Sequence, residues 1–528
     1  MPDEAASASS QLASASSLWP AVLLVWLAAE IAFYFYFQYH LVPLANQRTP
    51  PQPYRGYERD RHLLLLKILH RIEWTCEQSD QDVRLFISKF LQQWFHPVQI
   101  GEQPAVGNSG NDKQHSAGSQ NGKSNISHGP PPPPLQKVSS ESMASSEESS
   151  VVGSNEDCIP LCSDSKRPQW TVPGLGRQDT DEFFAWAFFG KLPEKLQQSE
   201  VDELQICYDQ MQERLGLVFP PGSGWQLQPL RLSLEDVNPL HRPLAVYATV
   251  WMIQLAAGVL LRAVGYQRIV SASTGLTGWY RAARNEAGSK LLPLLFFHGI
   301  APAGLVFYLP MVLMGLGADG RAVFLFENKS ISCSMTFDAL TEENTVRGVT
   351  ELVDRYLEPN AELAVCGHSF GSCQLTWLLH APIRNRIRQL CLVDPVSILL
   401  SSPDVMTNFL YADSISKIRL VAASELFTEY YLRRHFSWYN SELWLEDLPE
   451  HLQVIVALSE CDEIVNSPNV KLAIEMHTAE HVKDADHLKV VYWKDVGHAS
   501  CVTSPAKWKD LKTSMLKQEL ALERQKTS

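Results

Sequence analysis

Six short apolar runs of strand length lie in the C-terminal half of the chain, and helical stretches separate them. The runs cover residues 291–297, 322–326, 363–366, 390–393, 452–458 and 490–493. The helical stretches cover residues 305–316, 342–356, 373–379 and 468–476. Continuous apolar runs are typical of strands buried on both faces, and helical crossovers join parallel strands. From Gly265 onward we therefore predict an α/β fold, with a mostly parallel sheet covered by helices on both faces.

The rest of the 528-residue chain differs from this region in composition. Residues 101–168 consist largely of Gly, Asn, Ser, Gln and Pro, and such a segment cannot bury enough apolar surface to become ordered. Helical spacing of apolar residues is found on both sides of it. We divide the chain into a polar tail (1–17), a transmembrane anchor (18–42), a helical region (43–100), a disordered linker (101–170), a second helical region (171–264), the sheet domain (265–505, with a helical lid at about 397–450) and a C-terminal helix or tail (506–528).

The apolar segment at residues 18–37 is interrupted only by Glu30, and about 20 such residues cross the hydrocarbon core of a bilayer. Aromatic residues at 33–37 suit the interface at its end. No Lys or Arg precedes the segment, whereas five basic residues follow it: Arg48, Arg55, Arg59, Arg61 and Lys67. The positive-inside rule therefore predicts a single-pass anchor with the catalytic part in the cytosol.

A second uncharged run covers residues 244–261 and is bordered by Arg242 and Arg262. Gln254 lies within it and its hydrophobicity is modest, which favours a buried or membrane-surface helix. Read as a second span, it would place the catalytic part on the opposite side of the membrane.

The net charge and the cysteine content argue against nucleic-acid binding and against a disulfide scaffold. The formal net charge of −13 gives no basic surface for nucleic acid, so no nucleic-acid partner is predicted. Ten cysteines in a chain of this length do not make a disulfide scaffold. Cys158 and Cys162 lack a second pair of ligands for zinc, and neither a metal nor a cofactor is expected. The run from Pro130 to Pro134 is either a stiff piece of linker or a ligand for an SH3-like groove.

The apolar run at 363–366 leads directly into Gly367-His368-Ser369-Phe370-Gly371, and a helical stretch follows. A nucleophile elbow has this strand–turn–helix context, because the serine takes a strained backbone conformation and the glycines let strand and helix approach. The five-residue motif alone is weak. Its setting makes Ser369 the predicted nucleophile.

A serine hydroxyl needs an imidazole to accept its proton, and the imidazole needs a carboxylate to hold its tautomer. In chain order the acid should come after the serine and the histidine last. Asp462 follows the run at 452–458, and His498 follows the run at 490–493. We predict Ser369, His498 and Asp462 as the catalytic triad.

Alternative assignments exist for several of these roles. Asp394, after the run at 390–393, is a rival acid but also forms a good turn with Pro395. Glu460 and Glu463 are nearer to Asp462 but less well placed. His368 fits a packed spacer beside the nucleophile better than a second base. His435 lies in the predicted lid, where a structural role competes with substrate contact.

The oxyanion of an acyl-transfer transition state should meet preorganised backbone N–H groups. One donor is the amide of Phe370, directly after the nucleophile. The other should come from the loop after the run at 291–297, where His298-Gly299 turns the backbone toward the serine, and we predict the amide of Ile300.

Residues 265–505 resemble the α/β-hydrolase superfamily in the His-Gly turn, the elbow, the late acid and the final Gly-His. More narrowly, the chain from residue 239 is similar to a eukaryotic group of membrane-associated α/β-hydrolase-domain (AB hydrolase-1) proteins. The stretches that carry this likeness are Leu294-Leu295-Phe296-Phe297-His298-Gly299, Gly367-His368-Ser369-Phe370-Gly371, Leu392-Val393-Asp394-Pro395-Val396 and Arg434-His435-Phe436-Ser437-Trp438. The resemblance implies the α/β-hydrolase fold and catalytic roles for Ser369, Asp462 and His498. Around the acid this chain has Ser459-Glu460-Cys461-Asp462 in place of the group's Gly-x-Asp-Asp, so Asp462 is the member of the triad that the resemblance supports least.

These patterns predict a membrane-anchored serine hydrolase that cleaves an ester, thioester or amide through an acyl-enzyme on Ser369. The anchor, the apolar segment at 305–316 and the aromatic lid favour a lipid-like substrate. Two alternatives remain at this stage: an acyltransferase that uses the same triad, and a non-catalytic scaffold that binds lipid. Fold alone does not choose among them.

Overall fold

The computed structural model describes residues 21–50, 61–79, 81–97, 168–224, 227–412, 419–480 and 487–527. Several predictions lie outside these residues: the polar tail at 1–17, the linker up to residue 167, the run from Pro130 to Pro134, and Cys158 and Cys162. Everything that follows concerns the described residues.

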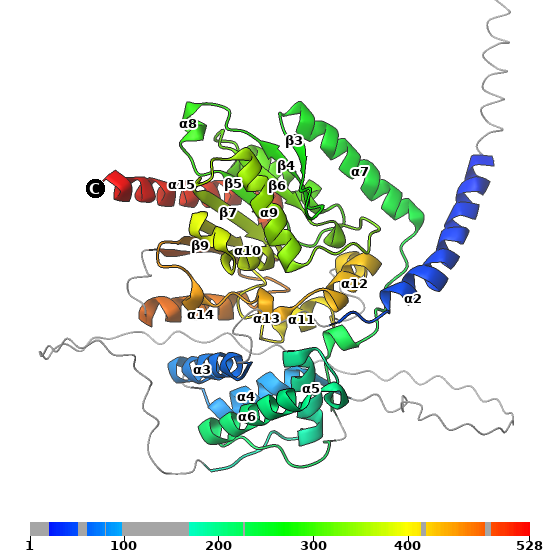
Figure 1. Ribbon diagram of the computed structural model, residues 1–528, viewed down its shortest axis with the longest axis vertical. Coiled ribbons are helices and arrows are strands. Elements are labelled where there is room, and N and C mark those ends of the chain that lie inside the picture. The colour runs from blue at the N-terminus through cyan, green and yellow to red at the C-terminus, as the bar shows by residue number, and fades with distance from the viewer. Residues whose placement is uncertain are drawn as a thin grey trace, which may run out of the picture. The chain divides into compact units, whose positions relative to one another are not determined.

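An eight-stranded sheet forms the centre of the domain (Figure 1). Its strands are β3 (Gln267–Val270), β4 (Thr277–Arg281), β5 (Leu294–Phe297), β6 (Val323–Glu327), β7 (Leu363–His368), β8 (Ile387–Val393), β9 (Gln453–Ser459) and β10 (Leu488–Trp493). Numbered in chain order within the sheet, the strands lie in the order 1-2-4-3-5-6-7-8. β4 pairs antiparallel with β3 and β6, and all other pairs are parallel. This confirms the predicted mostly parallel sheet.

Strand residues alternate between two apolar layers, one on each face of the sheet. In β5, Leu295 and Phe297 pack into the layer that contains α9 (Glu342–Tyr356) and α10 (Gly371–Leu379). Leu294 and Phe296 pack into the layer that contains α7 (Leu244–Ala263) and α15 (Pro505–Thr527). All four side chains of β5 are fully buried. Burial on both faces explains why these strands are continuously apolar in sequence.

The segment between β8 and β9 forms a helical lid. It contains α11 (Asp404–Phe409), η8 (Arg419–Ala423), α12 (Leu426–Arg434), α13 (Trp438–Ser441) and η9 (Leu445–Asp447). Glu425 caps α12 by accepting hydrogen bonds from the amides of Phe427 and Thr428. Tyr247 of α7 donates its hydroxyl to the same carboxylate, at 2.9 Å, and thereby ties the lid to α7.

A cluster of helices precedes the sheet: α3 (Arg61–Ser79), α4 (Val83–Gln93), α5 (Arg177–Phe189) and α6 (Gln198–Leu215). The helices on the two sides of residues 98–167 pack together, since Trp94 lies 5.4 Å from Phe183 and 6.0 Å from Trp186 between ring centroids. β1 (Phe95–Pro97) and β2 (Leu227–Pro229) add an antiparallel pair. A salt bridge of 2.8 Å from Arg71 of α3 to the buried Glu442 joins this cluster to the lid.

Two helices in the described part of the chain are long and apolar enough to cross a membrane, Ala21–Ala45 and Leu244–Ala263. The first ends in η1 (Phe37–Leu41) and α2 (Val42–Ala45). Its Glu30 accepts hydrogen bonds from the first amides of α7, those of Leu244 and Ala245, at 2.7 and 2.8 Å. In sequence Glu30 only interrupts an apolar run, whereas in the structure it caps a distant helix.

The residues that follow the N-terminal helix contact the lid at Arg434. The Nε of Arg434 donates to the carbonyl of Ala45 at 3.2 Å, and its Nη2 lies 3.4 Å from Oδ1 of Asn46. Thr49 donates its hydroxyl to the carbonyl of Arg434 at 2.7 Å. The end of the helix and the lid therefore form one hydrogen-bonded unit.

Two local features were not predicted. The predicted helical stretch at residues 305–316 consists of two pieces, η4 (Gly304–Tyr308, a 3₁₀ turn) and η5 (Met311–Leu316, a π-helix). Pro310 between them lacks the N–H that a continuous helix needs. The hairpin of β3 and β4 was not predicted at all, because Thr277-Gly278-Trp279-Tyr280-Arg281 lacks an apolar run. The remaining short elements are α8 (Glu286–Ser289), α14 (Ser467–Glu480), η2 (Pro193–Lys195), η3 (Leu232–Leu234), η6 (Lys329–Ile331), η7 (Pro382–Arg386) and η11 (Ser500–Thr503).

Candidate active site

Ser369 stands at the turn between β7 and α10, with a backbone φ of +51°. A non-glycine residue in the left-handed region is uncommon and marks a position that the surrounding structure holds in strain. The two glycines of the motif are required by contact. A Cβ on Gly371 would lie 2.3 Å from the carbonyl oxygen of Phe297, and one on Gly367 would lie 2.8 Å from the backbone of Gly371. The turn is therefore a nucleophile elbow in its geometry as well as in its sequence.

Three residues that follow different strands meet at this turn. The Nε2 of His498 lies 2.9 Å from Oγ of Ser369, and its Nδ1 lies 2.7 Å from Oδ2 of Asp462. The other carboxylate oxygen of Asp462 accepts the amides of Ile464 and Val465, both at 2.8 Å, which fixes its direction. With the Nδ1 proton given to Asp462, Nε2 is free to accept the proton of Ser369.

The strand order, the antiparallel second strand, the tight turn at Ser369 after the fifth strand, and the positions of Asp462 and His498 after the seventh and eighth strands together decide the fold. The domain has the α/β-hydrolase fold.

Comparisons with known proteins were made in three ways. Neither the scan against protein-family models nor the search of curated proteins found a match. Among solved structures, a bacterial membrane phospholipase A is similar over 52% of this chain and 94% of its own, with 12% identity and a TM-score of 0.34. A carboxylesterase from Bacillus subtilis is similar over 52% and 99%, with 13% identity and a TM-score of 0.34. An esterase from the archaeon Pyrobaculum calidifontis is similar over 52% and 91%, with 13% identity and a TM-score of 0.36.

The charge state of His498 is set by opposing effects. Burial alone would lower the pKa of its imidazole, but the hydrogen bond and negative charge of Asp462, together with Asp394 and Glu463, raise that pKa above its usual value. A raised pKa makes the ring a stronger base toward the hydroxyl of Ser369. It also means that the ring becomes protonated, and unable to accept that proton, at a higher pH than an ordinary imidazole does.

The loop after β5 lies directly against the nucleophile in this α/β-hydrolase fold. A Cβ on Gly299 would be 2.8 Å from Cβ of Ser369, so only glycine fits there. The amide of Gly299 donates to the hydroxyl of Tyr308 at 3.1 Å, which holds the loop in place. Ile300 is the next residue, and Phe370 is the N-cap of α10. Within the described residues neither the amide of Ile300 nor that of Phe370 has a backbone acceptor, which leaves both available to an oxyanion.

The rival acid Asp394 lies beside the triad but does not bond to the ring of His498. Its carboxylate accepts the amide of Ser459 at 2.8 Å, the hydroxyl of Ser459 at 3.1 Å and the amide of Ala499 at 3.2 Å. Burial would raise the pKa of Asp394, but the imidazoles of His368 and His498 and the amide of Ser459 lower it. A buried carboxylate thus connects the loop that bears the acid to the loop that bears the histidine.

Glu460 and Glu463, the other rival acids, also bind backbone amides of the histidine loop. Glu460 accepts the amide of Asp495 at 3.0 Å, and Glu463 accepts the amide of His498 at 2.8 Å. Gly497 approaches Glu463 so closely that a Cβ there would lie 2.6 Å from its carboxylate. In the sequence, only the cluster of acidic residues indicates that Glu460 and Glu463 bind the histidine loop, and this role was not predicted.

The two other histidines that were considered as functional lie in packed surroundings. His368 is buried, its Nδ1 lies 2.9 Å from the hydroxyl of Tyr308, and burial lowers the pKa of its imidazole. The Nε2 of His435 lies 2.9 Å from the hydroxyl of Tyr430 inside the lid, and burial lowers its pKa as well. Both histidines fit a structural role. Tyr308, which links His368 to Gly299, was missed in the sequence because a tyrosine in an apolar stretch carries no distinctive pattern.

Two aromatic residues of the lid pack against Phe370, the residue after Ser369. The ring of Phe436 lies 5.8 Å from that of Phe370, and Tyr431 lies at the same distance on another side. Other aromatic residues of the lid serve packing: Phe427 contacts Tyr247 and Phe337, and Trp444 lies under Arg71 at 4.0 Å.

The side chains of Asp394, Asp462 and His498 place potential metal ligands within 4.8 Å of one another. Each of them already has hydrogen-bond partners: Asp462 and His498 bond to each other, and Asp394 bonds to Ser459 and Ala499. This donor set suits proton transfer better than cation binding, because a metal would have to displace these bonds.

Proposed function

We propose that this chain is a serine hydrolase that cleaves an ester, thioester or amide of a lipid-like substrate through an acyl-enzyme on Ser369. The observation that supports the proposal most is the hydrogen-bonded series from Ser369 through His498 to Asp462 on a strained elbow. Packing alone does not require an imidazole to lie between a hydroxyl and a carboxylate, whereas general-base catalysis does.

In the acylation step Oγ of Ser369 attacks the substrate carbonyl carbon while Nε2 of His498 takes the hydroxyl proton. The carbonyl oxygen becomes an oxyanion and accepts hydrogen bonds from the amides of Phe370 and Ile300. When the tetrahedral intermediate collapses, the bond to the leaving group breaks and His498 delivers its proton to that group. Asp462 stays ionised and stabilises the imidazolium through its hydrogen bond at Nδ1.

In the deacylation step a water molecule takes the place of the leaving group. His498 accepts a proton from the water, and the resulting hydroxide attacks the acyl carbon of the ester on Ser369. The same two amides hold the second oxyanion, and collapse returns the proton to Oγ of Ser369 and releases a carboxylic acid.

The membrane side of the proposal rests on the helix Ala21–Ala45, whose composition fits a membrane anchor or a signal sequence. We propose the anchor, because Glu30 and the residues after the helix make specific contacts with α7 and the lid. Basic residues follow the helix and none precedes it, which favours a cytosolic catalytic domain. A catalytic domain held at a bilayer is suited to lipid substrates.

Labelling with a fluorophosphonate probe tests the chemistry. The full chain should react, Ser369→Ala should not, and Ser402→Ala, which changes a half-buried lid serine, should label like the wild type. Labelling of Ser369 without release of free acid from any ester would favour acyl transfer to another acceptor. Absence of labelling in the wild type would favour the non-catalytic scaffold and overturn the proposal.

A further inference from the structure

α7 is nearly all apolar, yet it is only half covered by the domain. Ala257 and Leu261 are buried against Trp279 and Tyr266. On the outward side Val259 is 60% exposed. Four further large apolar side chains of α7 are exposed and do not line the cavity described below: Val246, Met252, Ile253 and Leu260. A contiguous apolar face of this kind is rare on a soluble domain and marks a surface that something covers.

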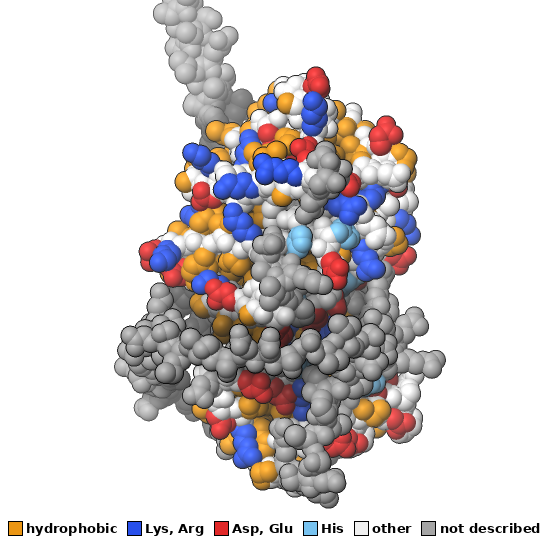
Figure 2. Space-filling model, turned by 90° about the vertical axis from the view of Figure 1, so that its left-hand side faces the viewer, with side chains coloured by type: hydrophobic (Ala, Val, Ile, Leu, Met, Phe, Trp, Pro, Cys, Tyr) orange, Lys and Arg blue, Asp and Glu red, His pale blue; other side chains and the backbone are white. Residues whose placement is uncertain are grey.

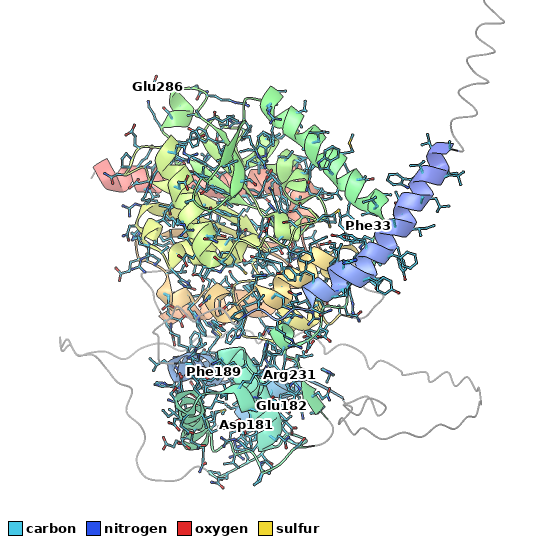
Figure 3. All side chains as sticks on the ribbon, turned by 45° about the vertical axis from the view of Figure 1, so that its right-hand side comes forward. Phe33, Asp181, Glu182, Phe189, Arg231 and Glu286 are labelled. Atoms are coloured by element: carbon cyan, nitrogen blue, oxygen red, sulfur yellow. The ribbon has the colours of Figure 1, made fainter. Side chains whose placement is uncertain are left out.

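The N-terminal helix continues this apolar face. Glu30 caps the start of α7, and Phe33 packs edge-on against Tyr247 with ring centroids 5.9 Å apart (Figure 3). Beyond that contact the N-terminal helix exposes a row of large apolar side chains that includes Leu23, Leu24 and Val25. Because the proposed anchor helix is joined to α7 by the half-buried carboxylate of Glu30, an anchor in a bilayer would place the apolar face of α7 next to the same bilayer. The side of the domain opposite to α7 carries Lys and Arg interspersed with Asp and Glu, as well as hydrophobic side chains (Figure 2).

A cavity of about 640 Å³ lies beneath α7, between this helix and the sheet. Most of its lining is apolar and includes Ala248 and Leu255 of α7 and Leu305 and Leu309 of the loop after β5. Its volume falls in the range of small-molecule sites, and apolar lining with a few polar groups is typical of them. Its α7 wall is the same helix that faces the bilayer on its other side.

Three cations line this cavity. Arg262 and Lys329 are exposed, and within the described residues neither has a carboxylate partner. Arg268 is paired with Glu327, which also lines the cavity, at 2.6 Å. The guanidinium of Arg262 lies over the ring of Trp279 at 5.3 Å, which positions it. An apolar space with unpaired cations at its rim is complementary to an amphiphile with an anionic head group.

The cavity also adjoins the catalytic loop. His298 and Ala303 line it, and Gly299, the residue after His298, lies against Ser369. The segment 298–303 therefore separates the cavity from the nucleophile and carries the amide of Ile300.

We propose that the cavity beneath α7 holds an acyl chain of an anionic membrane phospholipid, taken up from the bilayer in which the outward face of α7 is embedded. The inference rests on the proposed function, because it names the lipid class that is gathered beside segment 298–303, on whose other side Ser369 lies. The apolar lining takes the chain, and Arg262 and Lys329 take the phosphate at the rim.

Photo-crosslinking tests the proposal on the full chain in vesicles of phosphatidylcholine and phosphatidylserine. The probe is phosphatidic acid with a diazirine in its acyl chain, and crosslinked peptides are mapped. We expect crosslinks on residues 244–263 and 303–309 in addition to the N-terminal helix. Ala248→Trp fills part of the cavity. It should reduce crosslinks at 303–309 about tenfold, because roughly two methylenes of the probe's acyl chain lose their buried position.

Ala256→Trp is the matched control, because Ala256 lies on the exposed side of the same helix and does not line the cavity. It should leave the crosslinks at 303–309 unchanged. Arg262→Gln combined with Lys329→Gln should remove any preference for phosphatidic acid over phosphatidylcholine probes. Crosslinks confined to the N-terminal helix, or unaffected by Ala248→Trp, would overturn the cavity assignment. If the outward residues of α7 gave no lipid crosslinks, that face would be covered by water or protein, and its position in the bilayer would be overturned. Fluorophosphonate labelling of Ser369 in each variant reports separately on the proposed function.

Discussion

The loops after β8 and β9 each carry an aspartate close to His498, but they use it differently. Asp462, after β9, directs one oxygen at Nδ1 of the imidazole and is held by two amides of its own loop. Asp394, after β8, is completely buried and has a backbone φ of +44°. Its carboxylate accepts hydrogen bonds from the amides of Ser459, at the end of β9, and Ala499, in the histidine loop. Both aspartates lie close to His498, but only Asp462 directs a hydrogen bond at its ring.

This difference separates the chemical role of a carboxylate from its organising role. The carboxylate that bonds to the ring sets the tautomer, and only one carboxylate can do this. The other three near His498, those of Asp394, Glu460 and Glu463, bond to backbone amides and fix the position of the histidine loop. The comparison predicts a ranked series of effects when each of them is changed.

Asp462→Asn should have the largest effect, a loss of kcat of about 10⁴-fold, because an amide that faces Nδ1 favours the wrong imidazole tautomer. The measurement is hydrolysis of a short-chain chromogenic ester, with fluorophosphonate labelling of the same preparation. An effect no larger than that of Asp394→Asn would show that the two loops have exchanged roles.

Asp394→Asn should reduce kcat/KM about tenfold and displace the pH profile. The charge of Asp394 helps to raise the pKa of His498, so its removal lowers that pKa. Since the unprotonated ring is the active form, the acidic limb of kcat/KM should move to lower pH, whereas in the wild type it lies above the ordinary imidazole range. A purely structural defect would lower the plateau and leave the limb in place.

Glu463→Gln should have the smallest effect, about threefold on kcat, because the amide oxygen of glutamine still accepts the amide of His498 with a weaker hydrogen bond. Glu463 is exposed, so solvent already screens its charge. Steady-state kinetics beside Asp394→Asn provide the measurement. A loss that equals the Asp394→Asn loss would contradict the distinction between buried and exposed carboxylates.

The sequence predicted the features whose signals are local. The elbow is visible because its five residues are consecutive in the chain, although the contact that requires Gly371 is with the distant carbonyl of Phe297. Asp462 and His498 could be singled out as candidates because parallel strands bring their carboxyl ends to one edge of the sheet, so residues after strands meet.

Features that depend on distant partners were not predicted. Asp394 reads as a turn residue until Ser459 and Ala499 are placed beside it, and Glu30 reads as an interruption until α7 is placed against it. β4 escaped notice because its burial includes Arg281, which donates to the carbonyls of Gly317 and Arg321. In each case a polar side chain satisfies backbone groups that a sequence pattern does not reveal.

The contact between Arg434 and the end of the N-terminal helix has a practical consequence for enzymology. Arg434 is only 4% exposed, and Ala45 and Asn46 accept part of its hydrogen bonds. A version shortened to begin after residue 50 would leave buried N–H donors without acceptors, at a cost of about 1–3 kcal/mol, two residues before the phenylalanine that packs on Phe370. Such a truncation would be easier to purify, but its rates would describe a loosened lid and not the intact enzyme.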